Sequence, residues 1–226
     1  MLSFVAGYVD SCTYLGLFGV FVAQVTGSFV LGGTQFVKSE PGAVAKLVVI
    51  PFFFLAGMAV TVLIKSLRER PRAALAWSLT AEGVLLVGFL AACLAGMPFR
   101  RPDAPDAIVA LLFAMTAMGA QSAFVQLLLR GMPSTNVMTT NTTQLAISTA
   151  EILFGYIARA KADPGTESNS SYLQARRRFA VLLPIELGFL AGTTVGAIAY
   201  VTVGLICVSL TILPIGLLAA WAMRRS

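Results

Sequence analysis

The chain has 226 residues, of which 58% are hydrophobic and only 12% are charged, and its mean hydropathy is +0.85. Soluble domains are about 45–50% apolar and about 25% charged, so this composition excludes a water-soluble globular protein and indicates an integral membrane protein. The absence of histidine excludes histidine-based zinc sites, Ser-His-Asp triads and histidine proton relays, and we expect neither a metal nor a cofactor.

The formal net charge of +6 is distributed along the chain in a way that argues against nucleic-acid binding. Most basic residues gather at three places beside long apolar segments: Lys65, Arg68, Arg70 and Arg72; Arg159, Lys161 and Arg176 to Arg178; and Arg224 with Arg225. Lysine and arginine beside apolar segments mark the cytoplasmic side of a membrane protein and contact its anionic lipids. We therefore expect membrane lipids, and no nucleic acid, as partners.

Six apolar segments follow one another, at about 2–37, 42–66, 73–97, 107–158, 179–203 and 204–223. A helix needs about 20 residues to cross the hydrocarbon layer, so four of these segments are simple spans. The first and the fourth are too long for one span, and each contains residues that interrupt helices, Gly16 to Gly19 and Gly131 to Pro133. The sequence therefore predicts an all-α polytopic bundle with broken helices in its first and fourth segments.

The basic clusters then fix the expected topology. If both halves of 107–158 crossed, the basic stretch 159–178 would lie outside, against the positive-inside rule. We therefore expect 107–158, and likewise 1–37, to make one net crossing as a discontinuous or partly re-entrant pair of helices. This gives a single domain over 1–226 with six net crossings, both termini cytoplasmic, and a cytoplasmic loop at 159–178.

Short matches between the two halves indicate an internal repeat of 1–98 and 106–226. The run Phe54 to Gly57 recurs as Phe189 to Gly192, with a proline upstream of each. In the same order, Gly7 to Ser11 matches Met118 to Ser122, and Thr26 to Ser28 matches Thr143 to Leu145. Each half makes three crossings, so a duplication predicts a 3+3 inverted repeat, as in many secondary transporters.

Two runs in the first half, Val5 to Asp10 and Phe21 to Gly27, resemble the signature of the YoaK family of bacterial membrane proteins. Gly119 to Ala123 and Val137 to Asn141 resemble the same family in the second half. The chain departs from it at Ser28, where asparagine is usual, and at Gln144, where a second Thr-Gly is expected. The resemblance implies a multi-pass protein of the bacterial cytoplasmic membrane, in a family without an assigned function.

Four carboxyl groups fall inside apolar segments and are candidates for proton coupling: Asp10, Glu82, Glu151 and Glu186. A charge at the bilayer centre costs about 2.5–3.5 kcal/mol on insertion scales, so such residues usually face protein or water and mark pathways. The alternative is a structural pair, or a neutral carboxyl hydrogen-bonded between helices. Arg130, at the end of a predicted helix, fits a structural role at the helix C-terminus as well as a ligand contact.

The richest polar block follows the second predicted break, from Ser134 to Glu151. Asn141, Gln144, Ser148 and Glu151 fall on one face of a helix, which must face the bundle interior. Hydrogen bonding between helices would explain this face without function. The functional interpretation is a midplane cavity for a polar solute, lined by Asp10, Thr26, Gly27, Ser28, Gln121, Thr140, Asn141, Thr143, Gln144 and Glu151.

The three cysteines, Cys12, Cys93 and Cys207, lie far apart in apolar stretches and form no Cys-x-x-Cys pair. We expect them to be small buried hydrophobic residues without a redox or metal role.

These observations favour a small secondary transporter or channel-like permease for a small polar or ionic solute, with proton coupling through a buried carboxyl. The alternative is a structural, assembly or sensory membrane protein without transport. We do not expect an enzyme, because no nucleophile–base motif is present. A homo-oligomer is compatible with either function.

Overall fold

The computed structural model describes residues 1–129, 132–159 and 168–224, and these residues contain helices and no strand. The first half contains α1 (Leu2–Gly16), α2 (Val25–Lys38), α3 (Ala43–Val48), α4 (Ile50–Ser66) and α5 (Pro71–Gly96). The second half contains α6 (Pro105–Leu128), α7 (Met138–Arg159), α8 (Ser168–Val203), the short 3-10 helix η1 (Gly204–Val208) and α9 (Ser209–Met223). The all-helical fold expected from composition is confirmed.

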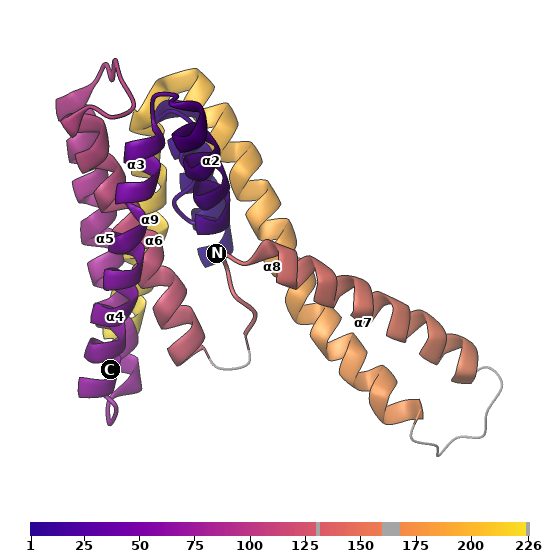
Figure 1. The fold of residues 1–226 in the computed structure, drawn as a ribbon. Helices are drawn as coiled ribbons and strands as arrows, with labels where there is room; N and C mark the ends of the chain where they lie inside the picture. Colours follow the sequence, from indigo (N-terminus) through magenta and orange to yellow (C-terminus); the bar gives the residue numbers. More distant parts are fainter. Residues whose placement is uncertain (130–131, 160–167, 225–226) are drawn as a thin grey trace.

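Most helices form one bundle, from which α7 and the beginning of α8 project as a helical hairpin (Figure 1). We call this hairpin, made of α7 and residues 168–184, the arm. Within the bundle α5 packs against α6 and α9, and the second part of α8 packs against α1. The arm is joined to the bundle through α8, which continues from one into the other over 36 residues.

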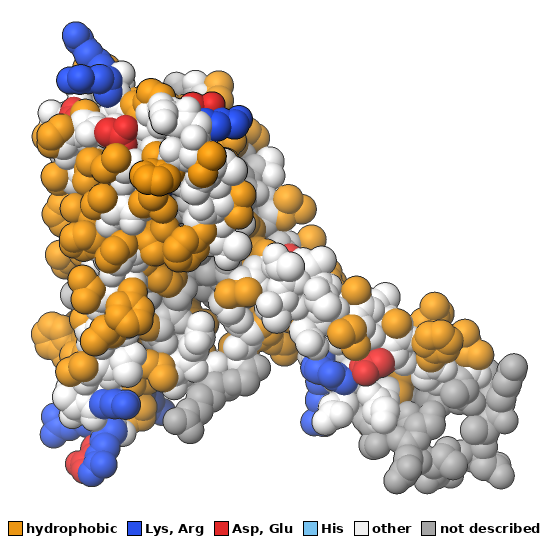
Figure 2. Space-filling view, viewed as in Figure 1, with side chains coloured by type: hydrophobic (Ala, Val, Ile, Leu, Met, Phe, Trp, Pro, Cys, Tyr) orange, Lys and Arg blue, Asp and Glu red, His pale blue; other side chains and the backbone are white. Residues whose placement is uncertain are grey.

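Apolar side chains cover the bundle between two ends that carry Lys and Arg (Figure 2). Large side chains face outward along this band, including Phe54 at 67% exposure and Val62 at 66%. A soluble protein rarely exposes contiguous apolar surface of this kind, whereas a lipid-facing surface requires it. The surface therefore fits a membrane protein.

Within the described residues, four stretches are long and apolar enough to cross a membrane: Ala43–Ser66, Pro71–Gly96, Pro105–Leu128 and Ser171–Met223. The last stretch contains two helices, α8 and α9, and the chain turns back between them at η1 (Figure 1). The helices α1 and α2 are 15 and 14 residues long, so each is shorter than an ordinary span.

Both predicted helix breaks are present. The first extends from Leu17 to Gln24 and begins where Phe18 and Gly19 adopt positive φ angles of 58° and 74°. The second lies between Leu128 and Met138, and two of its residues, 130 and 131, are outside the described part of the chain. We call these segments the first break (17–24) and the second break (129–137).

The polar loop predicted at 159–178 is shorter than expected, because α8 already begins at Ser168. Residues 160–167 of this predicted loop lie outside the described residues. The packing of the arm explains the difference: Gly155 of α7 leaves room for the ring of Tyr172 in α8, where a Cβ would come within 2.9 Å of the ring. This contact between helices outweighs the polar composition of the segment.

Close backbone contacts position two pairs of helices side by side. Gly192 and Gly196 of α8 lie against the Phe4 and Tyr8 carbonyls of α1, respectively, so the two helices run in the same direction. In the same way, Gly119 of α6 lies against the Phe53 carbonyl of α4. Glycine allows this approach because any Cβ would overlap the neighbouring backbone. The opening helix of each half therefore packs on a helix of the other half, α1 on α8 and α6 on α4.

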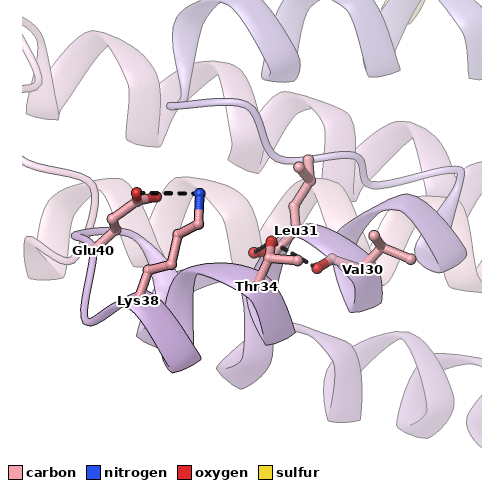
Figure 3. A network of polar contacts seen from close by, with 5 residues as sticks. All are labelled: Val30, Leu31, Thr34, Lys38 and Glu40. Atoms are coloured by element: carbon pink, nitrogen blue, oxygen red, sulfur yellow. Dashed lines mark hydrogen bonds and ion pairs between the residues drawn. The ribbon is translucent and has the colours of Figure 1, made fainter.

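Toward the C-terminal end of α2 the polar side chains contact residues that are near in sequence (Figure 3). The Thr34 hydroxyl donates to the Val30 and Leu31 carbonyls at 2.9 and 3.0 Å, as is common for threonine in helices. Lys38 lies 3.9 Å from Glu40, and Ser39 ends the helix in the left-handed conformation. This end of α2 is therefore a helix terminus at a polar surface.

Candidate functional site

The first break is held by a single buried carboxylate, that of Asp10 in α1. Its Oδ1 accepts the backbone N–H groups of Val22 and Ala23 at 2.7 and 2.6 Å, and its Oδ2 accepts that of Gln24 at 3.2 Å. Asp10 is 2% exposed, so these donors replace the water that a carboxylate would otherwise bind. Because the donors immediately precede α2, Asp10 also neutralises the positive end of that helix.

A second contact closes the same break from α2. The Ser28 hydroxyl, which is fully buried, donates to the Phe21 carbonyl at 2.6 Å and accepts the Phe21 N–H at 3.1 Å. Gly27 is needed beside it, because a Cβ there would come within 2.7 Å of the Phe21 ring.

The second break is closed at the corresponding position. Ser28 is the fourth residue of α2 and bonds to the residue seven positions before it. Asn141 is the fourth residue of α7, and its Nδ2 donates to the carbonyl of Ser134, also seven positions before it, at 2.6 Å. The contacts therefore align Ser28 with Asn141, four residues away from the alignment with Leu145 that the sequence match gives.

Uncharged side chains, rather than a carboxylate, hold the second break to α6. Gln121 Nε2 donates to the Thr135 hydroxyl at 3.0 Å and to the Leu2 carbonyl of α1 at 3.1 Å. Asn136 Nδ2 donates to the Ser122 hydroxyl at 2.7 Å, and its Oδ1 accepts the Thr135 hydroxyl at 2.9 Å. Gln121 Oε1 is buried and has no partner among the described residues. The network is thus not fully satisfied.

A pocket of about 650 Å³ opens beside the second break, between α7 and α8. Its polar lining comes from Ser134, Thr140, Asn141 and Gln144 on one side and from Arg177 and Arg178 on the other. The remaining lining is apolar: Met132, Pro133, Val137, Val181 and Leu182. A largely apolar pocket with a few convergent polar groups is typical of a small-molecule site.

The predicted site residues do not all converge on this pocket. Thr140, Asn141 and Gln144 line it, whereas Thr26 and Thr143 are exposed elsewhere on their helices. Asp10, Gly27 and Ser28 belong to the first break, and Gln121 belongs to the network at α6. Each break therefore gathers its own polar residues, and the described contacts include none between the two groups.

The four candidate carboxyl groups have different surroundings. Glu151 forms an ion pair with Arg178 at 2.8 Å within the arm, and Glu186 accepts the Thr142 hydroxyl at 3.2 Å. Glu82, near the middle of α5, is fully buried, and neither of its oxygens has a partner in the described part of the chain. Arg130 lies outside the described residues.

Two features of the site were not singled out in the sequence. Lys46 of α3 is 1% exposed and donates from Nζ to the Phe18 carbonyl at 2.8 Å, which ties the first break to α3. A lysine within an apolar segment is a visible signal for such a role. Thr135 and Asn136 lie within the polar block from Ser134 to Glu151 but were not named as site residues, since they precede the helical face that the spacing indicates.

The family model for "Protein of unknown function (DUF1275)" matches residues 1–223, which is almost the whole chain. The chain belongs to this family. No curated protein and no solved structure shows significant similarity to it. The assignment to DUF1275 identifies the family of the chain and assigns no activity to the breaks or the pocket.

Proposed function

We propose that this DUF1275 protein is a small secondary transporter or channel-like permease, with the pocket beside the second break as its solute site. The observation that carries the proposal is the lining of the pocket of about 650 Å³: hydroxyl and amide groups from the second break and the beginning of α7 lie opposite two guanidinium groups of α8. Among the described residues the lining contains no carboxylate, and the described ion pair of Glu151 is with Arg178. This charge balance favours a small polar solute that carries negative charge.

The proposed architecture is an inverted repeat with six net crossings, in the cytoplasmic membrane of a bacterium. In support, α1 packs parallel to α8 and α6 packs parallel to α4, and both breaks are closed by the fourth residue of the next helix. Helices α5 and α9, which end the two halves, run in opposite directions (Figure 1). Broken helices of this kind place unpaired backbone groups around solute sites in transporters.

The cytoplasmic side in this proposal is the end with the basic connection between α4 and α5. The C-terminal end of α9 and the free end of the arm point toward the same side of the molecule (Figure 1). The described residues of all three basic clusters then lie on one side, as the positive-inside rule requires. This orientation supports a cytoplasmic position for the 159–178 region and for the C-terminal end.

Glu82 is the best candidate for proton coupling. Asp10 is occupied by three backbone donors and Glu151 by a guanidinium, whereas the described surroundings of Glu82 offer no counter-charge or donor. A buried carboxyl without such partners is most stable in its neutral form, so a rearrangement that brings water or a cation to Glu82 would favour release of its proton. We propose that such a change accompanies transport.

The proposal is tested by thermal-shift screening of small organic and inorganic anions on purified protein, followed by uptake of any hit into proteoliposomes. A ligand present at 100 times its Kd stabilises the folded state by about 2.7 kcal/mol. Gln144→Ala and Arg177→Ala should each require at least ten times more ligand for the same thermal shift. Thr143→Ala, one residue from the pocket lining, should leave the required ligand concentration unchanged. Binding that is unaffected by the pocket variants would contradict the proposed site.

A structural or assembly role without transport is the second candidate. The first break favours it, because Asp10 and Ser28 are fully satisfied by neighbouring backbone and leave no polar group for a solute. Uptake of a stabilising anion that is abolished by Glu82→Gln while binding persists would favour the transporter. Binding without any uptake would favour the structural or sensory alternative.

A further inference from the structure

The search for a further site leads to two cysteines that are 195 residues apart in the chain. Cys12 of α1 and Cys207 of η1 bring their Sγ atoms to 3.3 Å, within hydrogen-bonding distance of each other. Both residues are buried, at 0% and 1% exposure. The expectation that the cysteines are buried is confirmed, but two of them lie together.

The surroundings hold this pair in place. The Tyr8 hydroxyl, one turn before Cys12 in α1, donates to the Cys207 carbonyl at 2.9 Å. Cys12 Sγ also contacts the Gly196 carbonyl of α8 at 3.7 Å. These contacts hold the two sulfurs 3.3 Å apart, and a bond requires them to approach to about 2.05 Å.

We propose that Cys12 and Cys207 form a disulfide bond that ties α1 to the connection between α8 and α9. The C-terminal end of α1 and the turn between α8 and α9 lie at the end of the bundle opposite the basic α4–α5 connection (Figure 1), and Gly16 packs against Leu205 there. In the orientation proposed above this end faces away from the cytoplasm, the side on which disulfides form and persist. The bond would join the first and second halves of the chain.

The chemistry requires an oxidant that reaches a buried position, and a lipid-soluble quinone is of the right class. Each thiol loses one proton and one electron as the S–S bond forms. The quinone takes up both electrons and both protons and becomes the quinol. Ile206, next to Cys207, is 50% exposed on the lipid-facing surface, so the connection is accessible from the membrane phase.

The third cysteine provides an internal control. Cys93 of α5 is buried in the same apolar cluster, but the described contacts place its sulfur in no hydrogen bond with the other two. It shares their burial without their sulfur contact. A specific cross-link must therefore leave Cys93 reduced.

The experiment treats membranes containing the full chain with duroquinone, whose fully substituted ring accepts electrons without forming thiol adducts. The protein is then denatured, and free thiols are counted with a maleimide that shifts its mobility on a gel. We expect the count to fall from three to one in the wild type and to return to three after reduction with dithiothreitol. Peptide mapping of the oxidised protein should show a Cys12–Cys207 link.

Three variants decide the pairing. Cys93→Ser should fall from two free thiols to none, whereas Cys12→Ser and Cys207→Ser should each keep both of their thiols after oxidation. Three reactive thiols in the oxidised wild type would overturn the proposal. A link that contains Cys93, or loss of thiols in Cys12→Ser, would overturn it as well.

Discussion

The two chain breaks are built on the same plan but with different chemistry. In both, the fourth residue of the following helix bonds back seven residues, through Ser28 in the first break and Asn141 in the second. The first break is then sealed by the charge of Asp10 on three backbone donors. The second is held by neutral amides and hydroxyls, and it opens onto the pocket beside α8.

This difference indicates a division of labour between the halves. Hydrogen bonds to a charged acceptor are stronger than bonds between neutral groups, so the first break is the more rigid of the two. Amide and hydroxyl groups can exchange one partner for another at lower cost, and Gln121 Oε1 has no partner among the described residues. We infer that the first break anchors the fold and that the second adapts to a solute.

The strongest test of this comparison is removal of the Asp10 carboxylate. Asp10→Ala leaves three backbone donors unpaired in a buried site, at roughly 1–3 kcal/mol each. We expect the free energy of unfolding in mixed detergent micelles to fall by about 4 kcal/mol, and by about half as much for Asp10→Asn, which keeps one acceptor.

Asp103 provides the matched control, since it accepts the N–H groups of Gly42 and Ala45 at 2.7 and 2.9 Å from an exposed position. Asp103→Ala removes a surface helix cap and should cost about 1 kcal/mol. Equal losses for Asp10→Ala and Asp103→Ala would show that burial of the first break adds nothing to the free energy of unfolding.

A smaller effect is expected at the second break. Asn136→Ala removes the partner of Ser122 and Thr135, both of which are buried or nearly so. The expected loss in the free energy of unfolding is about 2 kcal/mol, because the remaining hydroxyls rearrange among neutral partners. A loss larger than that of Asp10→Ala would reverse the assignment of anchor and adaptable break.

The smallest losses are expected at the two contacts between residues seven positions apart. Ser28→Ala leaves both polar groups of the Phe21 backbone without their partner, whereas Asn141→Ala frees only the Ser134 carbonyl beside a pocket. We expect losses of about 1.5 and about 0.5 kcal/mol, measured by the same unfolding assay. If a solute binds at the pocket, Asn141→Ala should weaken its binding and Ser28→Ala should not.

The sequence allowed the breaks to be located, because glycine and proline interrupt apolar segments that are too long for one span. It did not reveal the partners of the polar residues. Asp10 binds backbone N–H groups, and these carry no residue-specific signal. The partner of Glu151 was hidden for another reason: Arg178 lies in a stretch whose composition predicts a loop but which forms the beginning of α8.

The contact between Cys12 and Cys207 was also beyond the reach of local patterns. The two residues are separated by 195 positions, and the packing of α1 on α8 and η1 brings them together. Lys46 is a different case, since a lone lysine inside an apolar segment is unusual and could have been singled out. Its acceptor, the Phe18 carbonyl, could not.

The central claim is that the two breaks belong to halves of opposite orientation. Its most direct test uses Ser39→Cys at the end of α2 and Ser171→Cys near the beginning of α8, two exposed serines that follow the broken helices of their halves. The native cysteines are buried and provide an unlabelled background. With a membrane-impermeant maleimide on intact cells, we predict labelling of Ser39→Cys, and labelling of Ser171→Cys only after the cells are opened. Labelling of both positions from the same side would contradict the inverted arrangement.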